Sequence, residues 1–444
     1  MAINHRPSLF SWRSVESRSD LDRLRLVLET LPDEELMKRL EAKRGRGRND
    51  YPVRAIWNSL IAGIVFQHES IESLRRELSR NGELRDVCDF DPLGGGEAVP
   101  SSDAYSRFLK NLAEELDRIE QIFDELLVQL KELLPDLGHH LAVDGKQLPT
   151  YARGREDPEQ TSDPEADWGW RAYRGVSPQG KAWEKLMKWF GYKLHLIVDS
   201  VYELPLCWEV TRGSVTDTTH LLPLFEKLRR KHPAIVREAR DCAADKGYDS
   251  VRNVEGLWGQ YAIKPVIDMR LMRRSEEEFL VDESRADNIT YDQTGQVCCY
   301  CPKTGEQREM AYGGFEAQRE QLKYRCPAAA YGFECLGRAK CGTGRYGSYG
   351  RIVRIGLKRD PRIFTPLARS SYAWQRAYNR RTAIERVYAR LDVNFGFERH
   401  YIRGHRKMQL RVGLALMMML ALAVGHVRAG EKEKMRSLVK RPAA

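Results

Sequence analysis

Three carboxylates stand where they could carry metal-dependent chemistry. Asp144 lies in LAVDGKQL, an apolar strand expected to turn over at Gly145, and Asp245 ends a second such strand in CAADKGYDS. Glu385 falls in YNRRTAIERVYARLD, which has helical spacing. Magnesium and manganese prefer oxygen ligands, and two such ions can stabilise the attacking and leaving oxygens of a phosphodiester. If these residues converge at one edge of a sheet, they would suit an in-line displacement at phosphorus.

Each carboxylate also has an ordinary structural explanation. Asp144 could cap a turn after its strand, and Asp245 could form a salt bridge with Lys246. Asp249, four residues further on, is interpreted as a helix cap. Glu385 stands among several arginines, so helical salt bridges alone would account for it. The three carboxylates therefore carry weight only as a set.

The cysteines suggest a second metal. Six of the nine fall between Cys298 and Cys341, and clustering in an intracellular protein indicates metal binding rather than disulfides. Four thiolates would form a closed tetrahedral zinc site, whereas a catalytic zinc is not expected because no open His/carboxylate set accompanies them. The alternative is a set of reduced, unliganded cysteines. The members of the cluster are Cys298, Cys299, Cys301, Cys326, Cys335 and Cys341.

Two basic segments are candidates for contact with a phosphate backbone. The glycine-rich KRGRGRND carries three arginines, although a solvated loop would explain it as well. RHYIRGHRKMQLR interleaves aromatic and basic residues after the Glu385 helix and is the better candidate. His139 and His140, just before the Asp144 strand, are interpreted as loop residues rather than ligands. The basic candidates are Arg44, Arg46 and Arg48, then Arg399, Arg403, Arg406 and Lys407.

The elements that must position these residues divide the chain into five parts. Residues 1–137 have helical periodicity and form the first part. Residues 138–267 contain short β-branched and aromatic runs that alternate with helical ones. Residues 268–362 form a cysteine-bearing interruption. Residues 363–428 resume helical spacing and end in an apolar helix, and residues 429–444 are a basic tail.

The second part predicts a mixed sheet flanked by helices. Three strands come first, in LAVDGKQL, GYKLHLIVDS and LPLCWEVTRG, and a helix follows, capped by Thr216 or Asp217. A strand in IVREARDCAADKGY, a helix from Ser250 and the strand AIKPVI complete the order. This succession is typical of an α/β (α+β) domain.

Composition narrows the class of protein. The apolar fraction of 42% suffices for real cores, and the net charge of +10 favours a polyanionic partner. The N-terminus has no secretory signal pattern. The apolar run Val412–Val424 is shorter than the roughly 20 residues that span a bilayer, which favours a buried helix. We expect a soluble, intracellular protein without a membrane partner.

These motifs together resemble the DDE transposases of bacterial insertion sequences, over about residues 51–425. Tyr378, Arg381 and Glu385 are similar to the family signature of Tyr, two residues, Arg, three residues, Glu, six residues, Lys. VDGK at Asp144 and ADKGYDS at Asp245 resemble two other family blocks. The last signature position is Asp392, where the family usually carries a Lys that approaches DNA phosphate; Arg386 or Arg390 could supply that charge.

The resemblance implies an RNase H-like core, preceded by a helical N-terminal transposase domain that binds DNA. It implies Mg²⁺ (or Mn²⁺) held by Asp144, Asp245 and Glu385. It also implies cleavage at terminal inverted repeats, joining of the 3′-hydroxyl ends to target DNA, a homodimer on DNA and action in the bacterial cytoplasm. Tyr378, Arg381, Arg386 and Arg390 would contact DNA. The resemblance further selects a zinc tetrad of Cys301, Cys326, Cys335 and Cys341.

Two other functions remain open at this point. One is a transposase-derived DNA-binding protein that no longer cuts, which the Asp392 departure raises. The other is an RNase H-like nuclease that hydrolyses DNA without joining it. A metal-dependent cleavage assay separates the first from an active enzyme, and a joined product excludes the second.

Overall fold

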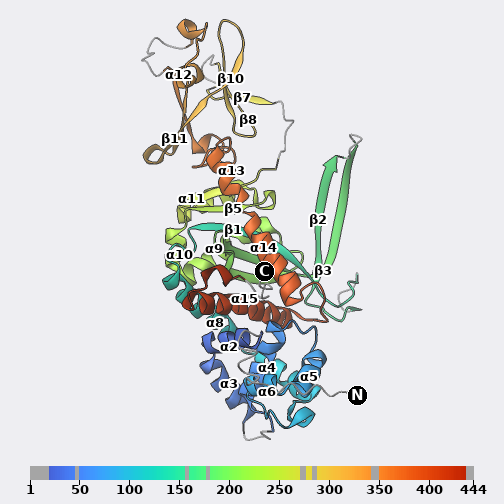
Figure 1. The fold of residues 1–444 in the computed structure, drawn as a ribbon. Helices are drawn as coiled ribbons and strands as arrows, with labels where there is room; N and C mark the ends of the chain where they lie inside the picture. Colours follow the sequence, from blue (N-terminus) through green and yellow to red (C-terminus); the bar gives the residue numbers. More distant parts are fainter. Residues whose placement is uncertain are drawn as a thin grey trace, which may run out of the picture.

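The computed structural model describes residues 20–45, 50–155, 160–176, 181–270, 277–282, 288–341 and 350–436. The parts follow one another along a long axis (Figure 1). N-terminal helices lie at one end, a mixed sheet lies in the middle, and a small β-rich insertion lies at the far end. A two-stranded ribbon projects from the side of the sheet.

The N-terminal helices are joined tightly to one another. Ser70 caps α5 by accepting a hydrogen bond from the Ser73 amide at 3.2 Å. The helical run that begins at Ser102 is divided in two near Glu115, whose carboxylate binds Lys43 of α3 at 2.6 Å. The helices are α2 (Asp20–Thr30), α3 (Glu34–Arg44), α4 (Val53–Val65), α5 (Ile71–Arg80), α6 (Gly82–Val87), α7 (Ser102–Ala113) and α8 (Leu116–Leu133).

The central sheet has the predicted mixed character. Strand β3 pairs antiparallel with both β1 and β4, whereas β1, β5 and β6 run parallel, so the order is β4-β3-β1-β5-β6 with β1 in the centre. The strands are β1 (His140–Pro149), β2 (Asp167–Val176), β3 (Ala182–Asp199), β4 (Leu204–Arg212), β5 (Asp241–Ala244) and β6 (Lys264–Ile267). The helices between them are α9 (Asp217–Lys231), α10 (Pro233–Glu238) and α11 (Val251–Tyr261).

This strand order identifies the fold. Apart from the ribbon strand β2, the chain first forms three antiparallel strands, β1, β3 and β4; β5 and β6 are then added in parallel beside β1, with helices on the faces. That arrangement is the RNase H-like sheet, and it confirms the predicted fold class.

Three details differ from the sequence-based expectation. Strand β1 does not turn over at Gly145: it continues to Pro149 because β3 pairs with it along that whole length. The segment expected to open the fourth strand begins instead as helix α10, with Pro233 in its first turn, where a missing amide proton costs nothing. Asp249 is not the cap of α11, since Ser250 accepts the hydrogen bond from the Asn253 amide.

The insertion has a core of its own. Its two small sheets have the orders β10-β9-β8-β7 and β11-β12-β13, and they enclose a buried cluster that includes Tyr291, Leu322 and Phe364. The elements are β7 (Glu278–Leu280), β8 (Ile289–Asp292), β9 (Val297–Tyr300), β10 (Gln307–Glu309), β11 (Ala311–Glu316), β12 (Gln321–Arg325), α12 (Pro327–Tyr331) and β13 (Ile352–Gly356).

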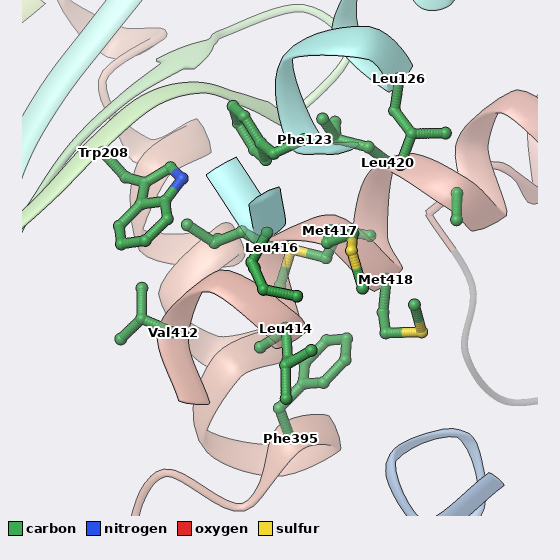
Figure 2. Packing of buried hydrophobic residues seen from close by; sticks show 14 of the residues in the cluster. Phe123, Leu126, Trp208, Phe395, Val412, Leu414, Leu416, Met417, Met418 and Leu420 are labelled. Atoms are coloured by element: carbon green, nitrogen blue, oxygen red, sulfur yellow. The ribbon is translucent and has the colours of Figure 1, made fainter. Parts of the chain in front are cut away.

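The chain then returns to the sheet through α13 (Tyr372–Asn379) and α14 (Thr382–Phe395), and the long helix α15 (His405–Arg428) follows. Helix α15 is long and apolar enough to cross a membrane, but 83% of its most apolar stretch is buried inside the fold, as predicted for a core helix. Figure 2 shows Leu416 and Leu420 of α15 near Phe123 of α8 and Trp208 of β4. One continuous core therefore joins the N-terminal helices to the sheet.

Candidate active site

The two aspartates are brought together by the register of the central strands. Strands β1 and β5 are parallel neighbours, and Val143 pairs with Ala244 at the end of their ladder. Asp144 is the next residue of β1, and Asp245 directly follows the last residue of β5. The pairing of β1 with β5 ends at this point, so the two carboxylates lie side by side at one edge of the sheet.

Asp144 is held in a position that is unfavourable for a charge. Only 7% of the residue is exposed, and its carboxylate accepts a hydrogen bond from the Gly145 amide at 2.8 Å. Burial, followed by the negative charge of Asp245, raises the pKa of Asp144 to about 7. A cation placed between the two carboxylates would relieve both effects.

Asp245 is fixed by its own turn and by an arginine from the ribbon. One carboxylate oxygen accepts a hydrogen bond from the Gly247 amide at 2.7 Å and caps the short 3-10 turn Lys246–Tyr248. The other oxygen pairs with the Arg171 guanidinium at 3.0 Å. The partner of Asp245 is thus Arg171 of β2, in place of the Lys246 that the sequence suggested.

Glu385 lies in the first turn of α14. One turn further on, the Tyr388 hydroxyl donates a hydrogen bond to the backbone carbonyl of Asp144 at 2.6 Å, which fixes α14 against β1. The Glu385 side chain itself is 53% exposed and pairs with Arg381 at 2.8 Å. Burial lowers the pKa of Arg381, but the nearby Glu385, Tyr378 and Asp144 outweigh that effect and raise it. Arg381 therefore stands close to both Glu385 and Asp144.

The donor set suits a hard divalent ion. Asp144, Asp245 and Glu385 offer carboxylate oxygens of the kind that Mg²⁺ and Mn²⁺ prefer. Among the residues described, no group of three or more His, Cys, Asp or Glu side chains has the geometry of a metal site. In this arrangement two guanidinium groups, those of Arg171 and Arg381, balance the charges of Asp245 and Glu385.

A further carboxylate, which sequence reasoning assigned only a capping role, lies at the same edge. Asp217 opens α9 and pairs with Lys193 at 3.2 Å, and its charge also raises the pKa of Asp144. A Cβ at Gly145 would lie 2.4 Å from Asp217 Oδ1, so this approach requires glycine. The cap of α9 is Thr216. No signal in the sequence connects Asp217 with β1.

The signature residues of α13 and α14 form one connected group. The Tyr378 ring stacks on Trp374, and the Arg381 guanidinium carbon lies 5.8 Å from the Tyr378 ring centre. Asp392, at the position of the family lysine, pairs with Lys146 of β1 at 2.6 Å. A positive charge from β1 is thus present where the signature places one on the helix.

The predicted DNA-contacting residues fall into two groups. Arg386 and Arg390 pair with Glu203, Arg386 at 2.6 Å, so their charges are already engaged within the protein. Arg44 pairs with Glu41 of its own helix at 2.9 Å. Arg46 and Arg48 lie outside the described residues. In the segment between α14 and α15 and the first turn of α15, the exposed cations are Arg399, Arg403, Arg406 and Lys407.

The cysteines of the insertion lie near one another and are not disulfide-bonded. Hydrogen bonds from the Thr304 hydroxyl and from the backbone amides of Lys303 and Thr304 lower the pKa of Cys301 to about 6, and Cys301 also hydrogen-bonds Cys335. The Cys341 sulfur accepts a hydrogen bond from Asn288 at 3.7 Å. The described part of the insertion nevertheless contains no metal-binding group, so the zinc tetrad that includes Cys326 gains no support.

An RNase H-like sheet with neighbouring aspartates at its central parallel strands, and a helix that carries a glutamate beside them, is an arrangement that suits metal-assisted phosphoryl transfer. Residues 137–421 match the Transposase DDE domain family, which is more than half of the chain. The chain belongs to this family, as the sequence predicted.

A solved structure, the piggyBac transposase synaptic complex with hairpin DNA, is 14% identical with a TM-score of 0.39, over 94% of this chain and 79% of that one. No curated protein matches the chain.

Proposed function

We propose that this protein is a DNA transposase that cuts at the terminal inverted repeats of its insertion sequence and joins the 3′-hydroxyl ends to target DNA. The observation that carries the proposal is the adjacency of Asp144 and Asp245 on β1 and β5, with Asp144 buried beside a second negative charge. Membership of the DDE transposase family supports a role for that pair in metal-dependent cleavage and joining of DNA.

Asp144, Asp245 and Glu385 would hold the divalent ions, Mg²⁺ or Mn²⁺. When bound, these ions supply an activated oxygen nucleophile and stabilise charge on the leaving oxygen. Tyr388 keeps Asp144 in place through its backbone carbonyl, and the burial of Asp144 excludes water from one side of the carboxylate pair. Arg171 and Arg381 release Asp245 and Glu385 and become available to the phosphates of the DNA.

The partner in this proposal is double-stranded DNA, both element ends and target, bound by a homodimer in the bacterial cytoplasm. The exposed cations Arg399, Arg403, Arg406 and Lys407 follow the Glu385 helix in the chain and are proposed to contact the DNA backbone. Tyr378 and Arg381 are proposed to contact DNA beside the carboxylates. Arg386 and Arg390 would first have to leave Glu203.

The test uses duplex DNA that carries the sequences flanking the coding region on both sides. With Mg²⁺, the wild-type protein should nick this DNA and form joined products. Asp245→Asn and Glu385→Gln should each lower the nicking rate by at least about a hundredfold, since each removes a charged metal ligand. Glu398→Gln, the same substitution at an exposed position, should retain the wild-type rate.

Three results would contradict the proposal. Nicking by Glu385→Gln at the wild-type rate would remove the assigned role of that residue. Hydrolysis without any joined product would indicate a plain nuclease. Binding without metal-dependent nicking would indicate a DNA-binding relative.

A further inference from the structure

The ribbon formed by β2 and β3 extends far beyond the sheet. Residues 191–199 of β3 pair with β1 and residues 192–199 pair with β4, but residues 182–190 pair only with β2. Figure 1 shows the two strands standing free of the other elements. A two-stranded ribbon is marginally stable alone in water, and large exposed apolar surfaces usually mark a binding site. Trp168, Trp170, Trp183 and Leu186 are all exposed on it.

The register assigns each side chain to one of two faces. Directly opposed residues share a face, and successive residues alternate between faces. Arg171 opposes Met187, and Gly175 opposes Trp183, so these residues lie on one face together with Lys185. We call this the inner face. The outer face carries Trp168, Trp170, Leu186 and Lys188.

Contacts at the root show that the inner face is turned toward the carboxylates. Arg171 pairs with Asp245, and the Met187 sulfur lies 3.8 Å from Gln147 Nε2 of β1. Trp189, also on the inner face, lies 5.7 Å from the Lys193 ammonium, which pairs with Asp217. A molecule bound at the carboxylates would therefore extend along the inner face.

The side chains of the inner face favour a polyanionic ligand. Among the described residues of the ribbon beyond Asp167, this face carries Arg171 and Lys185 and no acidic residue, together with the exposed indole of Trp183. Basic residues contact phosphates, and aromatic rings stack on bases or pack on sugars. The major groove of duplex DNA, about 12 Å wide, admits a two-stranded ribbon.

We propose that the inner face of the β2–β3 ribbon binds the duplex DNA that leads away from the cleavage position. Lys185 contacts phosphate, and Trp183 packs in the groove. This inference deepens the proposed function, because it names how the DNA is held beside the same carboxylates. The competing occupant, the ribbon of a second copy, is one outcome of the test below.

The experiment compares two double variants of the full chain that remove the same residue types from opposite faces. Trp183→Ala with Lys185→Ala alters the inner face, and Trp170→Ala with Lys188→Ala alters the outer face. All four side chains are exposed, so both variants should keep the wild-type unfolding temperature. Binding to a mixed-sequence 40-base-pair duplex is measured in EDTA by fluorescence anisotropy, over a series of salt concentrations.

We expect the inner-face variant to bind about tenfold more weakly, with a salt slope shallower by about 1, because one phosphate contact is lost. The outer-face variant should stay within about twofold of wild type. Equal effects of the two variants, or no effect of either, would overturn the inference. So would an inner-face variant that sediments as a monomer where wild type is a dimer but binds DNA normally.

The outcome is separable from that of the proposed function, because this assay needs neither metal nor cleavage. If the wild-type protein nicks and joins DNA but the inner-face variant binds DNA normally, DNA binding by the ribbon is refuted and the proposed function stands. If the inner-face variant binds DNA more weakly but the wild-type protein never nicks DNA, the proposed function is refuted and DNA binding by the ribbon is supported.

Discussion

Asp144 occupies a position in which its negative charge lowers the stability of the folded protein. Its carboxylate is buried beside Asp245 and Asp217, and the hydrogen bond from Gly145 only partly compensates. Sites that bind cations commonly gather such charges, because the bound ion repays the cost of burial. The arginines at Asp245 and Glu385 reduce the repulsion but leave Asp144 without a direct ionic partner among the described contacts.

The raised pKa of Asp144 predicts a pH-dependent stability. The folded state retains the proton up to about pH 7, whereas the unfolded chain releases it near pH 4, so stability falls as pH rises between these values. Without divalent ions, Asp144→Asn should therefore be more stable than wild type at pH 8, by on the order of 2–4 kcal/mol. At pH 4 the difference should largely disappear.

Urea unfolding at both pH values measures this difference in the free energy of unfolding. Added Mg²⁺ at pH 8 provides the control, since it should stabilise the wild-type protein and not the variant. A variant that is equally stabilised at pH 4 and pH 8 would show that ionisation of Asp144 is not the cause.

At the scale of the element, α14 is fastened to β1 at two points. Tyr388 donates to the Asp144 carbonyl, and one turn further on Lys146 pairs with Asp392 at 2.6 Å. The Lys146 ammonium also lies 5.6 Å from the Tyr388 ring centre. These contacts fix the distance between the helix that carries Glu385 and the strand that carries Asp144.

Reversing the charge at position 392 tests the second fastening. Asp392→Lys restores the family signature but places two ammonium groups together in a mostly buried position, so it should lower the free energy of unfolding by roughly 2 kcal/mol. Lys146→Asp combined with Asp392→Lys should recover most of that loss. Guanidinium unfolding of the wild-type chain, both single variants and the double variant completes the cycle. Additive losses would mean that the two side chains do not interact.

At the scale of the whole molecule, the N-terminal helices and the sheet share one large hydrophobic core, and the insertion has a smaller core of its own. Helix α15 packs on α8, α2 and β4, so the N-terminal helices and the sheet enclose one hydrophobic cluster. The insertion encloses another, built on β8, β12 and β13. Two cores of this kind are expected to unfold as separate cooperative units.

Matched truncations in the two cores test this division. Leu416→Ala in α15 and Leu322→Ala in β12 each remove a fully buried side chain, and each should cost about 2–5 kcal/mol in its own unit. Hydrogen exchange read by mass spectrometry should show faster opening of the sheet and N-terminal helices for Leu416→Ala. For Leu322→Ala it should show faster opening of the insertion alone. Equal loss of protection throughout the chain for Leu322→Ala would mean that the molecule has one unit.

Local pattern predicted much of this protein. Alternating and helical periodicities gave the strands around Asp144 and Asp245 and the helix of Glu385, because periodicity reports which face of an element is buried. The same patterns, with the family motifs, gave the RNase H-like class. They missed the ribbon, whose strands mix exposed tryptophan with charged residues and glycine and so lack an apolar face that alternation would reveal.

Only the tertiary structure decided which side chains meet. Arg171 reaches Asp245 across 74 positions, and Lys146 reaches Asp392 across 246. Asp217 enters the site because Gly145 leaves room for it. Such pairings depend on how strands and helices pack once their apolar faces are buried. The residues next to a charged residue in the chain do not indicate that packing, so they do not predict its partner. The sequence by itself therefore predicted Asp144, Asp245 and Glu385 as a set, and the fold determined their partners and added Asp217.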